Sequence, residues 1–210
     1  MGKPRGAGGG QTMFESAIRQ GGAAETGTAN ADDIYADSST HYAIVDALGG
    51  NDNVKTHDWN SIVNAGTGDD TVISGNAGDF VYGGEGNDRL VGQDFATRQI
   101  DVLSGETGND TLVNQGGFVR MIGGLGQDVY EIDTTRAQGT TITDFNVREG
   151  DVVRLTGIDA TLAQSLAAGG VEAIVQRYNL RLEDVRESGL QAQVVTAASG
   201  EATIEIRGRS

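Results

Sequence analysis

An apolar residue recurs every nine positions through the middle of this 210-residue sequence. With blocks of nine counted from Ser38, the eighth residue is apolar in ten successive blocks, and one four-residue insertion at 92–95 interrupts the count. Disordered sequence has no reason to keep this period, whereas stacked short strands need one inward side chain per turn. The register therefore predicts a stacked, all-β architecture. The ten residues are Val45, Val54, Val63, Val72, Val81, Leu90, Leu103, Leu112, Met121 and Tyr130.

A second pattern has twice this period. In alternate blocks the fourth residue is always glycine and the sixth is always aspartate. The glycines are Gly50, Gly68, Gly86, Gly108 and Gly126, and the aspartates are Asp52, Asp70, Asp88, Asp110 and Asp128. Glycine permits a positive φ that turns carbonyl oxygens toward one point, and aspartate adds a carboxylate. Such oxygens are the ligands of Ca²⁺, and because these blocks contain no His or Cys they suit zinc and softer metals badly.

Negative charge is concentrated in the same segment. Residues 30–133 hold 18 acidic and 4 basic side chains, a net of −14, within a chain whose formal charge is −15. This balance argues for cations and against nucleic acid, whose phosphates require Lys and Arg. Stacked carboxylates would repel one another at strand spacing unless a divalent ion lay between each pair. The sequence has no Cys, which excludes disulfides and thiolate metal sites. No apolar run reaches the length of a membrane span.

The alternate blocks resemble the nonapeptide Gly-Gly-x-Gly-x-Asp-x-U-x of the RTX (repeats-in-toxin) family, in which U is a large apolar residue. GGEGNDRLV (83–91) and GGLGQDVYE (123–131) match it at every defined position. The resemblance covers roughly residues 30–155. It implies an all-β fold, a right-handed parallel β-roll whose turns alternate between two edges. In that family each Ca²⁺ lies between adjacent turns, bound by carbonyls of the early turn residues and by the sixth-position aspartate.

The resemblance places about four Ca²⁺ ions on one edge, in the spaces between successive aspartates of the series. It adds three glycines near the start of these turns to the metal-binding set, namely Gly66, Gly84 and Gly124. GTANADDIY (27–35) resembles a degenerate first copy of the repeat, and its Asp32 would be the ligand of a fifth, more weakly bound ion.

The opposite edge departs from the family pattern. Only Asp79 and Asp101 keep the sixth-position carboxylate, and in their turns the fourth-position glycine is replaced. We therefore expect metal on one edge only, with polar and backbone hydrogen bonds holding the other. His41 and Trp59 share the fourth turn position there, and His57 lies in the same turn as Trp59. These rings either fill the place of a missing metal or form a sugar-binding or catalytic patch.

The chain divides into three segments. Residues 1–29 form a flexible segment or a short cap helix, residues 30–133 the roll, and residues 134–210 a small α+β cap. Within the last segment, 140–157 resembles the strand-turn-strand unit that closes many RTX rolls. Residues 159–188 have helical spacing with glycine stops, and the remainder reads as a β-hairpin.

The resemblance also implies where the protein acts. RTX proteins are commonly exported whole by type I secretion, through an uncleaved C-terminal signal, and the start of this chain lacks the apolar core of a cleaved one. No nucleophile-elbow, zinc-protease or P-loop motif occurs, so no enzyme activity is expected. We expect a secreted, extracellular calcium-binding module that folds on binding Ca²⁺ after export. The alternatives are an accessory domain of a secreted protease, lipase or alginate epimerase, an adhesin or surface-layer module that binds polysaccharide or a cell surface, and a small polysaccharide-active enzyme.

Overall fold

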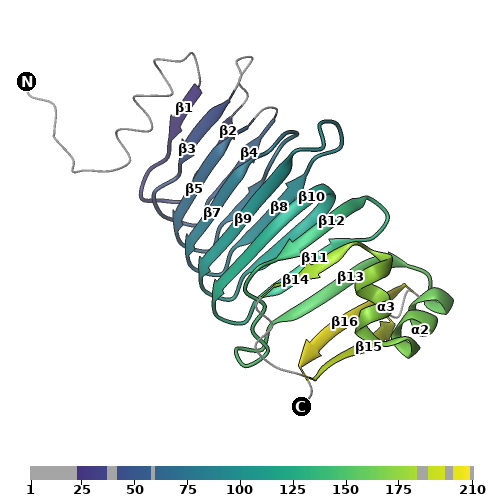
Figure 1. Cartoon of the computed structure of the whole chain (residues 1–210). Helices are drawn as coiled ribbons and strands as arrows, with labels where there is room; N and C mark the ends of the chain where they lie inside the picture. Colours follow the sequence, from purple (N-terminus) through teal and green to yellow (C-terminus); the bar gives the residue numbers. More distant parts are fainter. Residues whose placement is uncertain (1–22, 37–41, 58–59, 184–188, 197–200, 209–210) are drawn as a thin grey trace, which may run out of the picture.

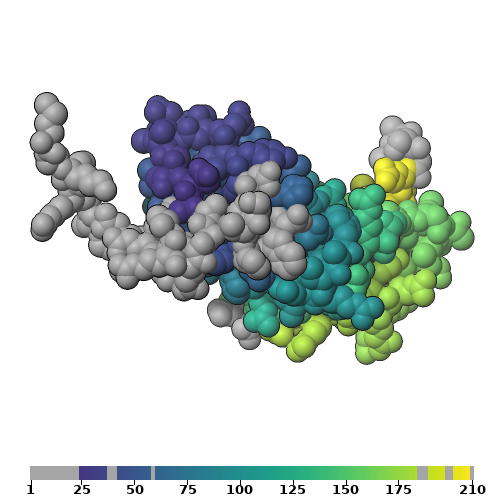
Figure 2. Space-filling model, turned by 90° about the horizontal axis from the view of Figure 1, so that it is seen from above, coloured from purple at the N-terminus to yellow at the C-terminus, as the bar shows by residue number. Residues whose placement is uncertain are grey.

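The computed structural model shows an elongated parallel β-solenoid of about six turns, with two helices beside its C-terminal end (Figure 1). It describes residues 23–36, 42–57, 60–183, 189–196 and 201–208. The expected N-terminal helix, His41 and Trp59, and most of the expected hairpin turn lie outside these residues. Seen from above, the turns follow one another in sequence order along the molecule, from purple to green and yellow (Figure 2).

Strands alternate between two stacked sheets. Sheet A contains β1 (Ala23–Thr26), β3 (Ala43–Asp46), β5 (Ile62–Thr67), β7 (Phe80–Glu85), β9 (Ile100–Thr107), the second half of β10 (Thr111–Leu125), β12 (Ala137–Ile142) and β14 (Leu180–Leu182). Sheet B contains β2 (Asp33–Ala36), β4 (Asn53–Thr56), β6 (Thr71–Ile73), β8 (Arg89–Gln93), the first half of β10, β11 (Val129–Asp133) and β13 (Val152–Ile158). All of these strands pair in parallel, so the parallel stacking extends beyond residues 30–133 in both directions.

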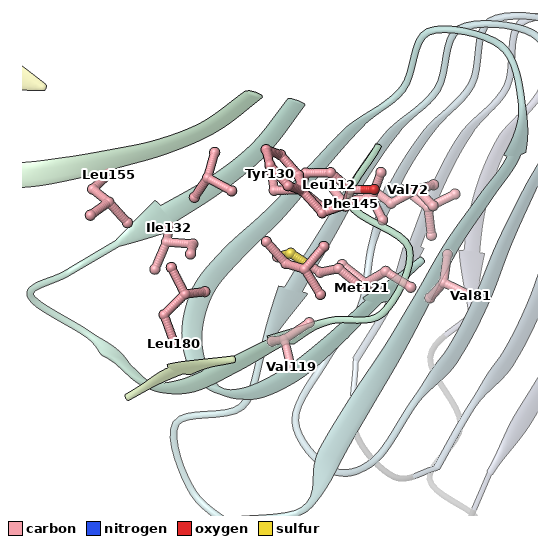
Figure 3. Close-up of a cluster of buried hydrophobic side chains, with 14 of the residues drawn as sticks. Val72, Val81, Leu112, Val119, Met121, Tyr130, Ile132, Phe145, Leu155 and Leu180 are labelled. Atoms are coloured by element: carbon pink, nitrogen blue, oxygen red, sulfur yellow. The ribbon is translucent and has the colours of Figure 1, made fainter. Parts of the chain in front are cut away.

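The nine-residue register fills the interior between the sheets. All ten apolar residues of the series are at most 1% exposed, as the sequence predicts. In sheet A they stack in one column across the strands, Val45, Val63, Val81, Leu103 and Met121, which Ile142 continues. Figure 3 shows side chains from both sheets meeting in this core around Tyr130 and Phe145. The core residues are small, Val and Ala, up to Val81, and are larger, mainly Leu, Met, Ile, Tyr and Phe, beyond it.

The C-terminal part combines the expected elements with one difference. Helices α2 (Ala160–Ala168) and α3 (Gly170–Arg177) confirm the helical spacing, and β15 (Leu190–Thr196) pairs antiparallel with β16 (Ala202–Gly208) as a hairpin. The helical prediction is wrong at Leu180–Leu182, which forms β14 and extends sheet A beside β12. Leu180 is buried and Arg181 exposed, an alternation that suits a strand at the end of a sheet.

Candidate metal centre

The five Gly-x-Asp turns lie on the same edge of the solenoid, where the chain passes from sheet A to sheet B. We call this the aspartate edge; its turns are residues 47–52, 65–70, 83–88, 105–110 and 123–128. The fourth-position glycines all have a positive φ, as do Gly66, Gly84 and Gly124 at the second position. Leu48 and Glu106 adopt the same left-handed conformation at that second position without being glycine. The backbone path of the turn is therefore kept where the glycine is lost.

The aspartates of this edge form a continuous ladder. The peptide N–H of each donates to Oδ1 of the aspartate in the next turn, at 2.7 Å from Asp52 to Asp70 and at 2.8 Å from Asp88 to Asp110. The ladder extends past the predicted series to Asp32 at one end and Asp151 at the other. Sequence reasoning missed Asp151, although the Gly-Asp pair at 150–151 carries the local signal.

One oxygen of each aspartate in the predicted series has no partner. Oδ2 of Asp52, Asp70, Asp88, Asp110 and Asp128 is buried and accepts no hydrogen bond. The two ends of the ladder differ: Oδ2 of Asp32 accepts from the N–H and hydroxyl of Thr28, at 2.6 and 2.9 Å, and Oδ2 of Asp151 accepts from the N–H of Asn146 at 2.8 Å. Buried polar atoms are normally satisfied, and a buried charge normally has a counter-charge. The five internal oxygens are therefore buried acceptors that the protein itself leaves without a partner.

The glycines leave room around these oxygens. A Cβ added at Gly83, Gly105 or Gly123 would overlap Oδ2 of the aspartate in the same turn. A Cβ at Gly108 would overlap the carbonyl oxygen of Gly86, and one at Gly84 would overlap that of Gly66. Carboxylate and carbonyl oxygens of neighbouring turns therefore approach one another closely only because these positions carry no side chain.

The donor set suits a hard cation. No group of three His, Cys, Asp or Glu side chains that could hold a metal occurs in the described part of the chain, so an ion on this edge would depend on backbone carbonyls as well as carboxylates. Ca²⁺ accepts such mixed oxygen ligands in flexible geometry, whereas structural zinc sites need four N, S or carboxylate ligands. The residues therefore fit Ca²⁺.

Burial makes the aspartates of this edge hard to ionise. It raises the pKa of Asp88 and Asp128 to about 7 and that of Asp70 and Asp110 to about 6, and it also raises the pKa of Asp52. The negative charges of Asp110 and Asp70 add to the effect at Asp88. A nearby cation would oppose both contributions and lower the pKa of these carboxyl groups, because it stabilises the ionised form.

In calcium-free solution the folded state is expected to lose stability as the pH rises from about 4 to 7. A carboxyl group whose pKa is raised on folding binds its proton more tightly in the folded chain. The stability that this bound proton gives to the folded state is therefore fully present when the pH is below the unfolded pKa of 3.8. It is lost as the pH rises through the folded-state pKa values of about 6 to 7. Urea unfolding followed by circular dichroism, in resin-treated buffers at about pH 4.5, 6 and 8, measures this. Greater stability at pH 8 than at pH 4.5 would contradict it.

A second ladder runs along the surface of the same edge. The fifth turn residues Asn51, Asp69, Asn87, Asn109 and Gln127 follow one another, and each of the first four accepts, through Oδ1, the peptide N–H of the next. These bonds measure 2.8–3.1 Å. Sequence reasoning missed this ladder, although every fifth position in the series carries an amide or a carboxylate. It links neighbouring turns through hydrogen bonds that use none of the aspartates of the Gly-x-Asp series.

The opposite edge has a different composition. Asp79 and Asp101 are both buried there, and the N–H of Asp79 donates to Oδ1 of Asp101 at 3.0 Å. His57 lies beside a shallow pocket of about 160 Å³ with Lys55 and Phe95. Because His41 and Trp59 lie outside the described residues, the aromatic patch expected on this edge stays a prediction.

The comparisons with known proteins identify no relative. No family model, no curated protein and no solved structure matches this chain. None of the described helices is both long enough and apolar enough to cross a membrane.

Proposed function

We propose that this protein is an extracellular calcium-binding β-roll module of the RTX type. The observation that carries the proposal is the set of five buried aspartates, stacked in register, each with one oxygen that lacks a partner. Both the orphan oxygens and the glycine positions around them coincide with the repeat that resembles the RTX nonapeptide. A solenoid that needed no metal would have no reason to bury these charges unpaired.

Four Ca²⁺ ions occupy the spaces between the five aspartates in this proposal. Oδ2 of the flanking aspartates and carbonyl oxygens of the glycine-rich turns would bind each ion. Asp32 does not belong to the set, because Thr28 already satisfies its Oδ2. Asp151 is likewise satisfied, so hydrogen bonds close both ends of the series.

Calcium binding and folding are coupled in this proposal. Residues 30–133 carry a net charge of −14, and four bound Ca²⁺ ions would reduce it to about −6. Several of the turns bury only Val and Ala, which contribute little hydrophobic stabilisation against that repulsion. The chain would therefore stay unfolded where calcium is scarce and fold outside the cell, where weak extracellular sites of about 10⁻⁴–10⁻³ M are filled.

Removal of calcium is expected to abolish most of the strand signal. Circular dichroism in chelator at neutral pH should show a largely unfolded chain, and addition of Ca²⁺ to millimolar levels should restore the β spectrum in one transition. Mg²⁺ at the same ionic strength is the control, since it screens charge equally but demands a smaller, octahedral site. An unchanged β spectrum in chelator, or equal recovery with Mg²⁺, would contradict the proposal.

A further inference from the structure

The outer face of sheet A carries a row of side chains that changes from apolar to cationic along the solenoid. Each of these residues directly precedes one that packs in the core, so its own side chain points away from the core. The strand register places them side by side from β3 to β14, in the order Ile44, Ile62, Phe80, Val102, Arg120, Thr141 and Arg181. The C-terminal half of the row therefore presents two guanidinium groups with a threonine between them.

A shallow groove of about 240 Å³ lies beside the cationic half of this row. Two parallel rows of outward positions line it, namely Arg120, Thr141 and Arg181 in one and Ile100, Phe118, Gly139 and Asn179 in the other. A Cβ added at Gly139 would lie 2.7 Å from Nδ2 of Asn179 and 3.0 Å from the ring of Phe118. The groove is therefore open at its middle because position 139 has no side chain.

The positive charge of the groove is largely uncompensated. Arg120 is exposed, and its side chain forms no ion pair or hydrogen bond with any residue that the structure describes. Its neighbours across the strands, Val102 and Thr141, carry no charge. Arg181 pairs with Glu183 at 3.1 Å, but its side chain remains 70% exposed. Because the whole chain has a formal charge of −15, an exposed cationic groove indicates a negatively charged ligand.

The spacing of the two arginines suits one extended conformation in particular. Arg120 and Arg181 lie two strands apart, which separates their backbones by roughly 9.5 Å. In a polyproline II helix, residues three apart lie on the same side at a distance of about 9.3 Å. The backbone of such a helix stays solvated, so it needs no hydrogen bonds from a sheet whose own groups are already paired in the ladder. Acidic side chains three residues apart would therefore each meet one guanidinium group, which binds a carboxylate through paired N–H groups.

We propose that this groove binds an acidic peptide segment of a partner protein in the polyproline II conformation. One carboxylate binds Arg120 and another, three residues away, binds Arg181, while the exposed side chain of Ile100 and the ring of Phe118 contact the residues between. Apart from the arginines, only Thr141 and Asn179 line the groove with polar side chains that are not buried. These are few for the many hydroxyl groups of a sugar chain, so a peptide fits better than an acidic polysaccharide. The site is separate from the aspartate edge and requires only the folded solenoid.

Binding of a synthetic peptide tests this site. A fluorescein-labelled peptide of repeated Glu-Pro-Pro units is titrated with the full chain in millimolar Ca²⁺ and about 0.15 M salt, where charges more than about 8 Å apart are largely screened. Fluorescence anisotropy should show binding, and the corresponding Gln-Pro-Pro peptide should bind at least tenfold more weakly. Arg120→Gln should weaken binding of the acidic peptide about tenfold or more. The matched control, Arg89→Gln, removes one exposed arginine from the outer face of sheet B and should change it less than twofold.

Several results would overturn the inference. They are equal weakening in Arg120→Gln and Arg89→Gln, equal binding of the two peptides, and binding of polygalacturonate with none of the Glu-Pro-Pro peptide. Circular dichroism shows whether each variant is folded, and Arg181→Gln, which should also weaken binding, decides the question if Arg120→Gln is not. A chain that folds without calcium should bind the peptide equally well in chelator, so failure of the proposed function would leave this test intact.

Discussion

Replacement of Gly108 by alanine is expected to prevent the aspartate edge from stacking, even in saturating calcium. Gly108 has a φ of +138°, and a Cβ there would overlap the carbonyl oxygen of Gly86 in the neighbouring turn. Neither group can move away alone, because both belong to backbones held by the parallel ladder. Strain of about 1–3 kcal/mol for the left-handed residue and a similar overpacking cost give a loss of roughly 4 kcal/mol. Urea unfolding in the presence of Ca²⁺, followed by circular dichroism, measures the loss.

Gly170→Ala is the matched control for this experiment. Gly170 also has a positive φ, of +78°, but a Cβ added there would meet nothing within 4 Å. The control therefore carries the conformational strain without the collision, and we expect a loss of only about 1 kcal/mol. Equal losses in the two variants would mean that the close approach of Gly86 and Gly108 does not hold the edge together.

The Asp88→Asn substitution is expected to raise the calcium concentration at half-folding about tenfold or more. Asp88 lies third in the series of five, so its carboxylate would serve an ion on each side. Asparagine keeps the shape and can still accept the N–H of Asp70 through Oδ1, but it loses the charge that attracts both ions. A loss of about 1.4 kcal/mol in binding already corresponds to a factor of ten. Calcium titration at fixed ionic strength, followed by circular dichroism, measures the shift.

Glu85→Gln provides the comparison for Asp88→Asn. Glu85 is exposed in the same turn, so its substitution removes one negative charge without removing an orphan oxygen. We expect its midpoint to change less than twofold, as is usual for an exposed charge. A substitution at Asp79 would be a poorer comparison, because Oδ2 of Asp79 is also buried and accepts no hydrogen bond. Equal shifts for Asp88→Asn and Glu85→Gln would show that general repulsion, rather than coordination, controls folding.

The repeating part of the fold could be predicted because the position of a residue within the repeat decides where its side chain lies. A strand residue points inward or outward according to its position, so Val54, Val72 and Leu90 had to be buried together once the turns stacked. The same argument placed the five aspartates on one edge, since two nine-residue blocks return the chain to that edge. Periodicity thus gave both the core and the candidate site.

The remaining features depend on contacts between segments that the nine-residue repeat does not predict. Strand β14 forms because β12 offers an unpaired neighbour, and this partner outweighs the helical spacing around Leu180. Asp151 joins the ladder after a turn of different length. Each of these required the three-dimensional position of a distant segment.

The core side chains become larger along the solenoid, so its N-terminal and C-terminal turns differ in hydrophobic stabilisation. A linear stack gains its stability from each turn and from the interface with the next turn, so its ends need not be equivalent. Each step from Val to Leu adds one buried methylene, about 0.8 kcal/mol, and the turns around Leu112, Tyr130 and Phe145 are those with the large side chains. We therefore expect the C-terminal turns to nucleate the stack, and the N-terminal turns, whose core side chains are small, to form last and unfold first. Because a chain is synthesised from its N-terminus, this polarity would delay assembly of the stack until the C-terminal turns of the solenoid have been made.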